Sequence, residues 1–272
     1  MKHLFEDWQK IIEQFSGRNI FTMLDYDGTL APIAETPEEA VIPEETKKTL
    51  LRLTKNRKFK VAIVSGRSLK DIKDKVGLEE IIYVGNHGLE IDGPKIKFSS
   101  PISLKHRDIL RKSKEELAKN LSSIEGVIFE DKMFSLGVHF RMVSEEKVPL
   151  VKRIFGETMA PFLAKGKIKV RPAKKALEIR LPVEWNKGRI ALWLLAREEF
   201  ARSGINFLPV YIGDDSTDED AFLALKKSGL TIFVGESKIS QAKYFLKDTK
   251  EVGNFLKEIL EISGRSNDGG IN

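Results

Sequence analysis

The sequence predicts an α/β fold in which a doubly wound, mainly parallel core is interrupted by a smaller α+β unit. Short apolar segments alternate with helical segments at both ends of the chain, as in parallel sheets whose strands are joined by helices. Acidic and hydroxyl side chains follow several of these apolar segments directly. Between residues 105 and 184 the order changes to helix, strand, strand, repeated once, which indicates a separate inserted unit.

The first part of the core contains three predicted strands. Phe21–Leu24 and Ile81–Val84 are short apolar runs, and Lys60–Val64 is a continuous run of the kind that is buried on both faces of a parallel sheet. Helices are predicted at 44–56 and 69–76. An amphipathic helix is predicted before the first strand from the spacing of its apolar residues, which are Leu4, Phe5, Trp8, Ile11, Ile12 and Phe15.

The inserted segment is predicted to form a mainly antiparallel sheet with helices on one side. Its helices are expected at 106–121 and 148–163, and its strands at 127–129, 134–140, 168–170 and 176–181. We therefore expect two domains, a core formed by residues 1–104 and 185–272 and an α+β insert formed by residues 105–184.

The core pattern resumes after the insert. A helix is expected at 186–202, a strand at 208–212, then a further helix, a strand at 231–234 and a last helix at 252–262. Strands and helices that alternate on both sides of the insert make the expected core Rossmann-like. The polar, Gly-rich tail at 263–272 is predicted to be disordered.

The composition is that of a soluble globular protein, with 41% hydrophobic and 32% charged residues. No apolar run approaches the ~18 residues that a membrane span needs, so no membrane association is expected. Because cysteine is absent, disulfides and thiol catalysis are excluded, and a cytoplasmic location is expected.

The net charge of +6 is concentrated in the insert. Residues 105–184 hold 18 Lys and Arg against 11 Asp and Glu, so the rest of the chain carries a net charge of −1. A basic segment is one mark of a nucleic-acid binder, but these cations are dispersed and lack the aromatic side chains that stack on single-stranded bases. We therefore expect a small anionic substrate and no nucleic-acid partner.

Two carboxylates follow the first core strand at a spacing of two residues. Residues at this spacing in a strand point to the same face, so Asp25 and Asp27 can converge, and Gly28 allows a sharp turn beside them. Two like charges this close need a cation between them or a proton on one of them. Asp and Gly are also ordinary turn residues, but the buried strand in front of them favours a functional site.

The ends of several segments carry groups suited to phosphoryl transfer. They are Asp25 with Asp27, Ser65, Lys187 at a helix start, and Asp214 with Asp218. The carboxyl ends of parallel strands share one edge of a sheet, where open α/β proteins bind their ligands. Carboxylates, a hydroxyl, a lysine and helix N-termini suit a Mg²⁺-assisted reaction, because oxygen ligands favour Mg²⁺ over a soft metal.

These residues resemble the motifs of the haloacid dehalogenase superfamily of aspartate-nucleophile phosphatases. The motifs occur here in the superfamily's order as Asp25-Tyr26-Asp27-Gly28-Thr29, Ser65, Lys187 and Gly213-Asp214 with Asp218. Longer segments are similar to the trehalose-6-phosphate phosphatases within it, namely Leu24–Ile33, Val64–Arg67, Gly85–Glu90 and Tyr211–Phe222. In the insert, the segments similar to that family's cap motifs are Glu130–Lys132, His139–Arg141 and Lys174–Arg180.

The resemblance implies roles for the core residues. Asp25 would be the nucleophile that forms an aspartyl-phosphate, and Asp27 would act as general acid and then as general base. Mg²⁺ would be held by the Asp25 carboxylate, the Asp27 backbone carbonyl and Asp214, with Asp218 nearby. The residues that would bind the phosphate are Ser65, Gly66 and Lys187.

The resemblance also implies that the insert is a cap domain that recognises the sugar. The residues that it assigns to the sugar are Glu130, Lys132, Lys174 and Glu178 in the cap. Arg67, Asn86 and His87 follow core strands and are further candidates for contact with the phosphate or the sugar. Charged side chains form strong hydrogen bonds to sugar hydroxyls. On the residues alone, each could equally be an exposed strand-edge charge or a turn residue.

The sequence therefore predicts a Mg²⁺-dependent trehalose-phosphatase that hydrolyses trehalose 6-phosphate to trehalose and phosphate. We expect a monomer that pairs functionally with a trehalose-phosphate synthase. Phosphatases of sucrose phosphate or of glycosyl-phosphoglycerates share the mechanism and remain an alternative. A second alternative is a non-catalytic regulatory domain, although such a domain would be expected to lack one of the catalytic groups, and all are present.

Overall fold

The computed structural model describes residues 1–99, 102–131, 135–173, 175–182, 185–236 and 239–265. The chain divides into two compact units, the core (Met1–Phe98 with Trp185–Asn272) and the insert (Ser99–Glu184). The insert begins earlier than the predicted residue 105 because its first helix, α4 (Ile102–Asn120), starts before the predicted residue 106.

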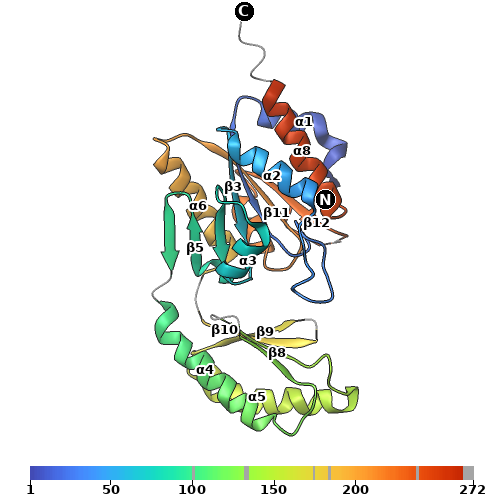
Figure 1. Cartoon of the computed structure of the whole chain (residues 1–272), viewed down its shortest axis with the longest axis vertical. Coiled ribbons are helices and arrows are strands. Elements are labelled where there is room, and N and C mark those ends of the chain that lie inside the picture. Colours follow the sequence, from blue (N-terminus) through green and yellow to red (C-terminus); the bar gives the residue numbers. More distant parts are fainter. Residues whose placement is uncertain (100–101, 132–134, 174, 183–184, 237–238, 266–272) are drawn as a thin grey trace, which may run out of the picture. The chain divides into compact units, whose positions relative to one another are not determined.

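The core is built on one nine-stranded sheet (Figure 1). The strand order is β1-β13-β12-β11-β2-β3-β4-β5-β6, and each neighbouring pair from β1 to β4 in this order is parallel. β5 pairs with β4 in the antiparallel direction. The strands are β1 Lys2–His3, β2 Asn19–Leu24, β3 Phe59–Val64, β4 Ile82–Gly85, β5 Glu90–Gly93, β6 Ile96–Ser99, β11 Phe207–Gly213, β12 Leu230–Val234 and β13 Tyr244–Leu246. The predicted doubly wound, mainly parallel core is confirmed.

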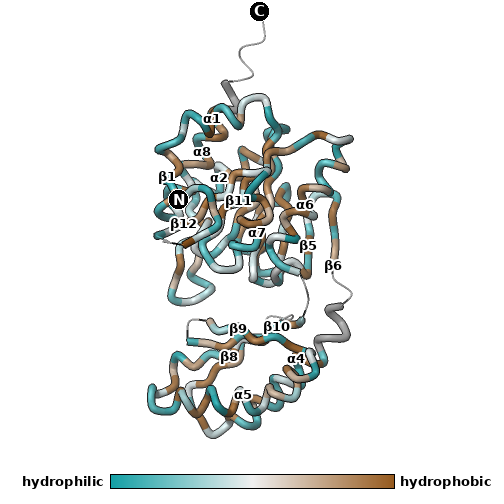
Figure 2. The backbone as a smooth tube through the Cα atoms, turned by 180° about the vertical axis from the view of Figure 1, so that it is seen from behind, coloured by the Kyte–Doolittle hydropathy of each residue, from teal (hydrophilic) through white to brown (hydrophobic). Residues whose placement is uncertain are grey.

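Helices cover both faces of this sheet because the strand side chains alternate between two apolar layers. In β2, Ile20 and Leu24 belong to one layer, whereas Phe21 and Met23 belong to the other. The first layer is closed by α1, α2, α3 and α8, and the second by α6 and α7. These helices are α1 Trp8–Phe15, α2 Glu44–Lys55, α3 Leu69–Val76, α6 Lys187–Ala201, α7 Glu219–Leu225 and α8 Thr249–Arg265. Figure 2 shows hydrophobic stretches within both the strands and the helices of the core.

Several short elements differ from the sequence-based expectations. β1 and β13 have two and three residues, too few for a periodic pattern, and β5 has one buried residue, Ile91. The predicted N-terminal helix is a 3-10 turn, η1 (Leu4–Asp7), followed by α1. The predicted disorder of the tail is wrong for residues 263–265, which belong to α8, and residues 266–272 lie outside the described residues.

The insert holds a four-stranded antiparallel sheet of order β7-β8-β10-β9, with α4 and α5 (Val148–Ala164) on one side (Figure 1). Its strands are β7 Ile128–Asp131, β8 Ser135–His139, β9 Lys169–Ala173 and β10 Ala176–Arg180. The register places Glu130 of β7 and Glu178 of β10 opposite the same residue of β8, Gly137. Residues directly opposite across strands share a face, so the two carboxylates stand on the same face of the sheet.

Within the described part of the chain, no helix has the length and apolarity that a membrane span requires.

Candidate active site

The predicted strand ends meet at the carboxyl edge of the core sheet. β2 lies between β3 and β11 and is parallel to both. Asp25, Ser65 and Asp214 directly follow these three strands, so they lie at neighbouring strand ends. The Asp25 N–H donates to the carbonyl of Ile212 in β11 (2.9 Å), which fixes the start of the turn that carries Asp25.

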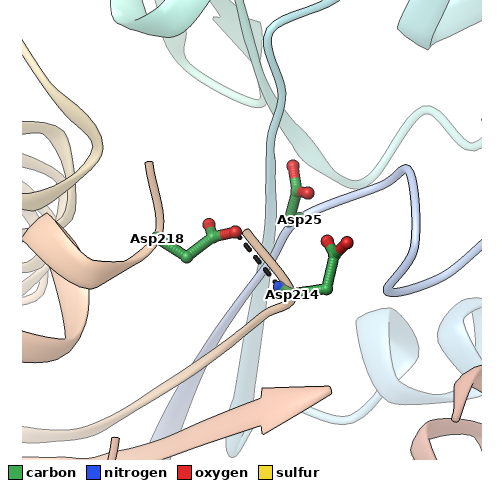
Figure 3. A group of neighbouring side chains, drawn as sticks. All are labelled: Asp25, Asp214 and Asp218. Atoms are coloured by element: carbon green, nitrogen blue, oxygen red, sulfur yellow. Dashed lines mark hydrogen bonds between the residues drawn. The ribbon is translucent and has the colours of Figure 1, made fainter. Parts of the chain in front are cut away.

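Three carboxylates converge at this edge (Figure 3). Asp25, Asp214 and Asp218 each present an oxygen, and these oxygens lie within 4.8 Å of one another. Asp218 is fully buried and Asp25 is 6% exposed, so water does little to screen the repulsion between them. Such a group needs positive charge beside it, and carboxylate oxygens are the ligands that a hard divalent cation prefers.

Lys187, the first residue of α6, brings an ammonium group into the cluster. Its Nζ lies 2.9 Å from Asp25 Oδ1 and 2.8 Å from Asp218 Oδ1, and its side chain is buried. The helix start is fixed by a cap, because the Asn186 side chain accepts the Arg189 N–H (2.8 Å). The cap therefore sets the position of the residue that carries the ammonium group.

Asp218 anchors the loop that follows β11. Its Oδ1 accepts hydrogen bonds from Lys187 Nζ (2.8 Å) and the Tyr211 hydroxyl (2.8 Å). Its Oδ2 accepts the backbone N–H groups of Asp214 (3.2 Å, dashed in Figure 3) and Asp215 (3.1 Å). Four donors on one buried carboxylate hold this loop in a single conformation, and with it the side chain of Asp214.

The turn after β2 packs directly on Asp214. Thr29 Oγ1 donates to Asp214 Oδ1 (3.3 Å). Gly28 has a φ of +80°, and a Cβ at this position would lie 2.1 Å from Asp214 Oδ2. Both the backbone conformation and the available space therefore require glycine here.

Burial dominates the electrostatics of the cluster. It raises the pKa of Asp25 to about 7 against the opposing charge of Lys187. It also raises the pKa of Asp214 to about 7, with the charges of Asp218 and Asp215 adding to the effect. Burial alone would lower the pKa of Lys187, but the charges of Asp218 and Asp25 outweigh it and raise that pKa above its ordinary value. The lysine therefore stays charged, and the carboxylates favour any further cation that reaches them.

Asp27 lies in a different environment from Asp25. Its side chain is 43% exposed and is held by Arg67, whose Nε donates to Oδ2 (2.7 Å) and whose Nη2 donates to Oδ1 (2.6 Å). Burial would lower the pKa of Arg67, but its hydrogen bonds to Asp27 and Asp71 raise that pKa above its ordinary value. Arg67 is predicted above to bind substrate, and in the structure its guanidinium group contacts these two carboxylates.

This fold and cluster can be compared with known proteins. A model of the trehalose-phosphatase family matches residues 23–250. The chain belongs to this family. Trehalose-phosphate phosphatase B of Arabidopsis thaliana is 34% identical to it over 267 residues, which span 93% of this chain and 70% of that relative. Trehalose 6-phosphate phosphatase RA3 of Zea mays is 33% identical in an alignment that covers 94% of this chain and 74% of that relative.

Solved structures agree with this assignment. Trehalose-6-phosphate phosphatase of Aspergillus fumigatus aligns with a TM-score of 0.68 at 26% identity, covering 96% of this chain and 99% of the other. A trehalose-6-phosphate phosphatase related protein aligns with a TM-score of 0.74 at 25% identity, and the alignment covers 90% of this chain and 99% of the other. A haloacid dehalogenase-like hydrolase from Bacteroides thetaiotaomicron shares the fold at 15% identity, with a TM-score of 0.63. The alignment covers 89% of this chain and 100% of the other. The predicted family, fold and enzyme class are confirmed.

The remaining core residues predicted to bind the substrate or the phosphate lie at the ends of β3 and β4. Ser65 is buried, and its Oγ accepts the Arg67 N–H (3.1 Å). Gly66 lies between these two residues. Asn86 is buried and has a φ of +51°. Its backbone N–H donates to the Arg67 carbonyl (2.7 Å), and its side-chain Nδ2 donates to Glu90 (2.6 Å). In the structure, Asn86 therefore supports the turn that carries Arg67. The backbone of His87 lies in the 3-10 turn η2 (Asn86–Gly88), and its side chain lies outside the described residues.

Two of the predicted cap residues are described. Glu130 Oε2 lies 2.8 Å from His139 Nε2. Glu178 accepts hydrogen bonds from Ser135 Oγ (3.0 Å) and Arg180 Nε (2.7 Å). Both glutamates flank Gly137, where a Cβ would lie 2.9 Å from His139 Nε2 and 3.4 Å from Glu130. Lys132 and Lys174 lie outside the described residues.

Sequence reasoning missed two residues of the site. Tyr211 and Thr29 contact Asp218 and Asp214, respectively. Both belong to the sequence motifs that identify the family, but a hydroxyl within a motif gives no sign of which carboxylate it will contact. The side chain of Tyr211 points towards the site from within a buried strand, where sequence patterns predict core packing.

We expect the Lys187→Met substitution to destabilise the protein strongly. It would leave Asp25 and Asp218 buried without their ammonium partner, which should lower the free energy of unfolding by about 3–5 kcal/mol. Urea denaturation in the presence of a chelator measures this. Lys48→Met is a matched control, because Lys48 pairs with Glu45 at the surface (3.2 Å) and should contribute less than about 0.5 kcal/mol. Equal effects of the two substitutions would contradict the role given to the buried pair.

Proposed function

We propose that this protein hydrolyses trehalose 6-phosphate to trehalose and inorganic phosphate, with Asp25 as the nucleophile and Mg²⁺ as the cofactor. The observation that carries the chemistry is the buried contact of Asp25 with Lys187 (2.9 Å) beside Asp214 and Asp218. Membership of the trehalose-phosphatase family and the names of its plant relatives support the choice of substrate. The completeness of the acidic and basic groups argues against a non-catalytic regulatory domain.

The donor atoms of the cluster fit a magnesium ion. Asp25 and Asp214 offer carboxylate oxygens at one sheet edge, and the Asp27 backbone carbonyl would complete the protein's share of the ligands. Asp218 belongs to the same cluster, but four hydrogen bonds already occupy its oxygens, so we assign it to orienting Asp214 and Lys187. A bound Mg²⁺ would neutralise charge on the phosphate as the anionic nucleophile approaches it.

The reaction would proceed in two steps. In the first, an Asp25 oxygen bonds to phosphorus, the bond from phosphorus to the sugar oxygen breaks, and Asp27 gives that oxygen a proton. In the second, a water oxygen bonds to phosphorus, its proton passes to Asp27, and the Asp25 carboxylate is released. Lys187, the Ser65 hydroxyl and the amide of Gly66 would hold the phosphate oxygens, aided by the N-terminus of α3.

The insert would act as the cap domain that selects the sugar. Glu130 and Glu178 lie opposite Gly137 on the same face of the sheet, where their carboxylates offer acceptors for sugar hydroxyls. Lys132, Lys174, Asn86 and His87 remain proposed substrate contacts by resemblance. Sucrose phosphate and glycosyl-phosphoglycerates present the same ester and hydroxyl groups, so they are the competing substrates.

We expect phosphate release from trehalose 6-phosphate to exceed that from sucrose 6-phosphate, glucose 6-phosphate and a glycosyl-phosphoglycerate. The Asp25→Asn variant should lose at least about 10³-fold in kcat, because an amide cannot form the covalent intermediate. A phosphate-release assay with each substrate tests both expectations. Turnover of a different substrate alone would overturn the assignment of trehalose 6-phosphate, and retained activity of Asp25→Asn would overturn the covalent mechanism.

We expect Mg²⁺ to raise the Tm of the protein by about 5 °C at a concentration well above its Kd, because it binds only the folded acidic cluster. The rise should be larger at pH 8 than at pH 5. Burial raises the pKa of Asp25 and of Asp214 to about 7, so both carboxyls are protonated at the lower pH and ionised at the higher one. Thermal unfolding with and without Mg²⁺ measures this, and the Asp214→Asn variant should lose the effect.

We expect Gly137→Ala to raise the KM for trehalose 6-phosphate about tenfold, because the new methyl group would lie 2.9 Å from His139 Nε2 and 3.4 Å from Glu130 and would displace this pair. Turnover of 4-nitrophenyl phosphate, which has no sugar, should be unchanged. Gly156→Ala in α5 is the matched control, since a Cβ there would meet nothing within 4 Å. An unchanged KM in Gly137→Ala would show that this part of the cap sheet does not contact the sugar.

A further inference from the structure

Most of the hydrogen-bonding capacity of Arg67 is used inside the core. Nε and Nη2 donate to the two oxygens of Asp27 (2.7 and 2.6 Å), and Nη2 also donates to the Pro37 carbonyl (2.9 Å). Nη1 donates to Asp71 Oδ2 (2.8 Å). These four bonds leave the guanidinium group little capacity for a further ligand.

Arg67 is also held rigidly along its length. Its N–H donates to Ser65 Oγ (3.1 Å), and its carbonyl accepts the Asn86 N–H (2.7 Å), so its backbone is tied to the ends of both β3 and β4. Its guanidinium carbon lies 5.4 Å from the centre of the buried Tyr26 ring. The side chain is only 11% exposed. Such a residue is suited to fix the position of another group.

Asp27 depends on this contact for its orientation. At 43% exposure its carboxylate would otherwise sample several rotamers. Among the described residues, the hydrogen bonds that reach the Asp27 carboxylate come from Arg67. Two parallel N–H···O bonds from a planar fork fix both the place and the plane of the carboxylate, which a lysine cannot reproduce.

We propose that Arg67 is a positioning residue that orients Asp27 for the hydrolysis of the aspartyl-phosphate, and that it does not bind the substrate. This inference rests on the proposed function, in which Asp27 takes a proton from water in the second step. Both Asp27 oxygens accept N–H groups of Arg67, so the carboxylate is held in one plane at the site. The water oxygen bonds to phosphorus, its proton goes to Asp27, and the bond between phosphorus and Asp25 breaks with its electron pair returning to Asp25.

The test separates the two steps with 4-nitrophenyl phosphate. Its leaving group departs without a proton, so the first step does not need Asp27. In Arg67→Lys, rapid-mixing kinetics should show an unchanged first turnover and a steady-state rate lowered about 10–100-fold. The phosphorylated enzyme should accumulate and be recoverable after acid quenching. The double variant with Asp27→Asn should be no slower than Asp27→Asn alone, because Arg67 acts through Asp27.

Arg202→Lys is the matched control. Arg202 also lies over an aromatic ring, Phe207 (5.4 Å), and donates to a backbone carbonyl, that of Arg57 (3.1 Å). The Arg202→Lys substitution should leave both the first turnover and the steady-state rate unchanged.

An unchanged steady-state rate in Arg67→Lys would overturn the inference, and so would equal slowing of the first turnover and of the steady-state rate. An increased KM for trehalose 6-phosphate with normal turnover of 4-nitrophenyl phosphate would instead make Arg67 a substrate-binding residue. If Asp27→Asn itself left both steps unchanged, the proposed role of Asp27 would fail, independently of Arg67.

Discussion

The buried contact of Lys187 with Asp25 and Asp218 is the interaction on which the site depends. Three carboxylates at one sheet edge repel one another where water cannot screen them, so the fold must bring a cation and several N–H donors to the same point. The lysine comes from the start of α6, which lies close to the start of α7. A Cβ on Gly188 would be 2.3 Å from the Asp220 carbonyl, so this approach of the two helices is possible only with glycine. A packing constraint between helices thus sets the electrostatics of the cluster.

The same sequence motif places two aspartates in opposite environments, and this separates their chemistry. Asp25 is buried against Lys187, where the proposed nucleophile would be shielded from water. Asp27, two residues later, is half-exposed and paired with Arg67 from the next strand end. A group that exchanges protons with a leaving oxygen and with water needs access to both, which a buried aspartate would lack. The difference begins directly after β2, which ends at Leu24, so neither aspartate lies in the strand geometry that would have kept both side chains on one face.

Much of the fold could be predicted from the sequence because the central strands are continuous apolar runs. β2, β3 and β11 carry the site, and their ends could be read from the polar residues that follow them. The edge strands β1 and β13 are too short to leave a pattern, and β5 has a single buried residue. Within the site, the shared sheet edge predicted that Asp25 would lie beside Asp214 and Asp218, but the spacing of Asp25 and Asp27 wrongly suggested that these two carboxylates would converge. The pairing of Arg67 with Asp27 joins residues 40 positions apart and depends on turn geometry, which periodicity does not encode.

The two units of the chain use charge in different ways, and the difference follows from what each must bind. In the core, Asp25, Asp218 and Lys187 are buried and contact one another, which suits a phosphate that always presents the same oxygens. On the cap sheet, Glu130 and His139 are 35% and 38% exposed and contact each other at 2.8 Å. A pair at this exposure can exchange its partner for a sugar hydroxyl without leaving a buried charge unpaired. Under the proposed function, changes to such residues would alter substrate preference at little cost in stability, whereas changes to the core cluster would cost both stability and chemistry.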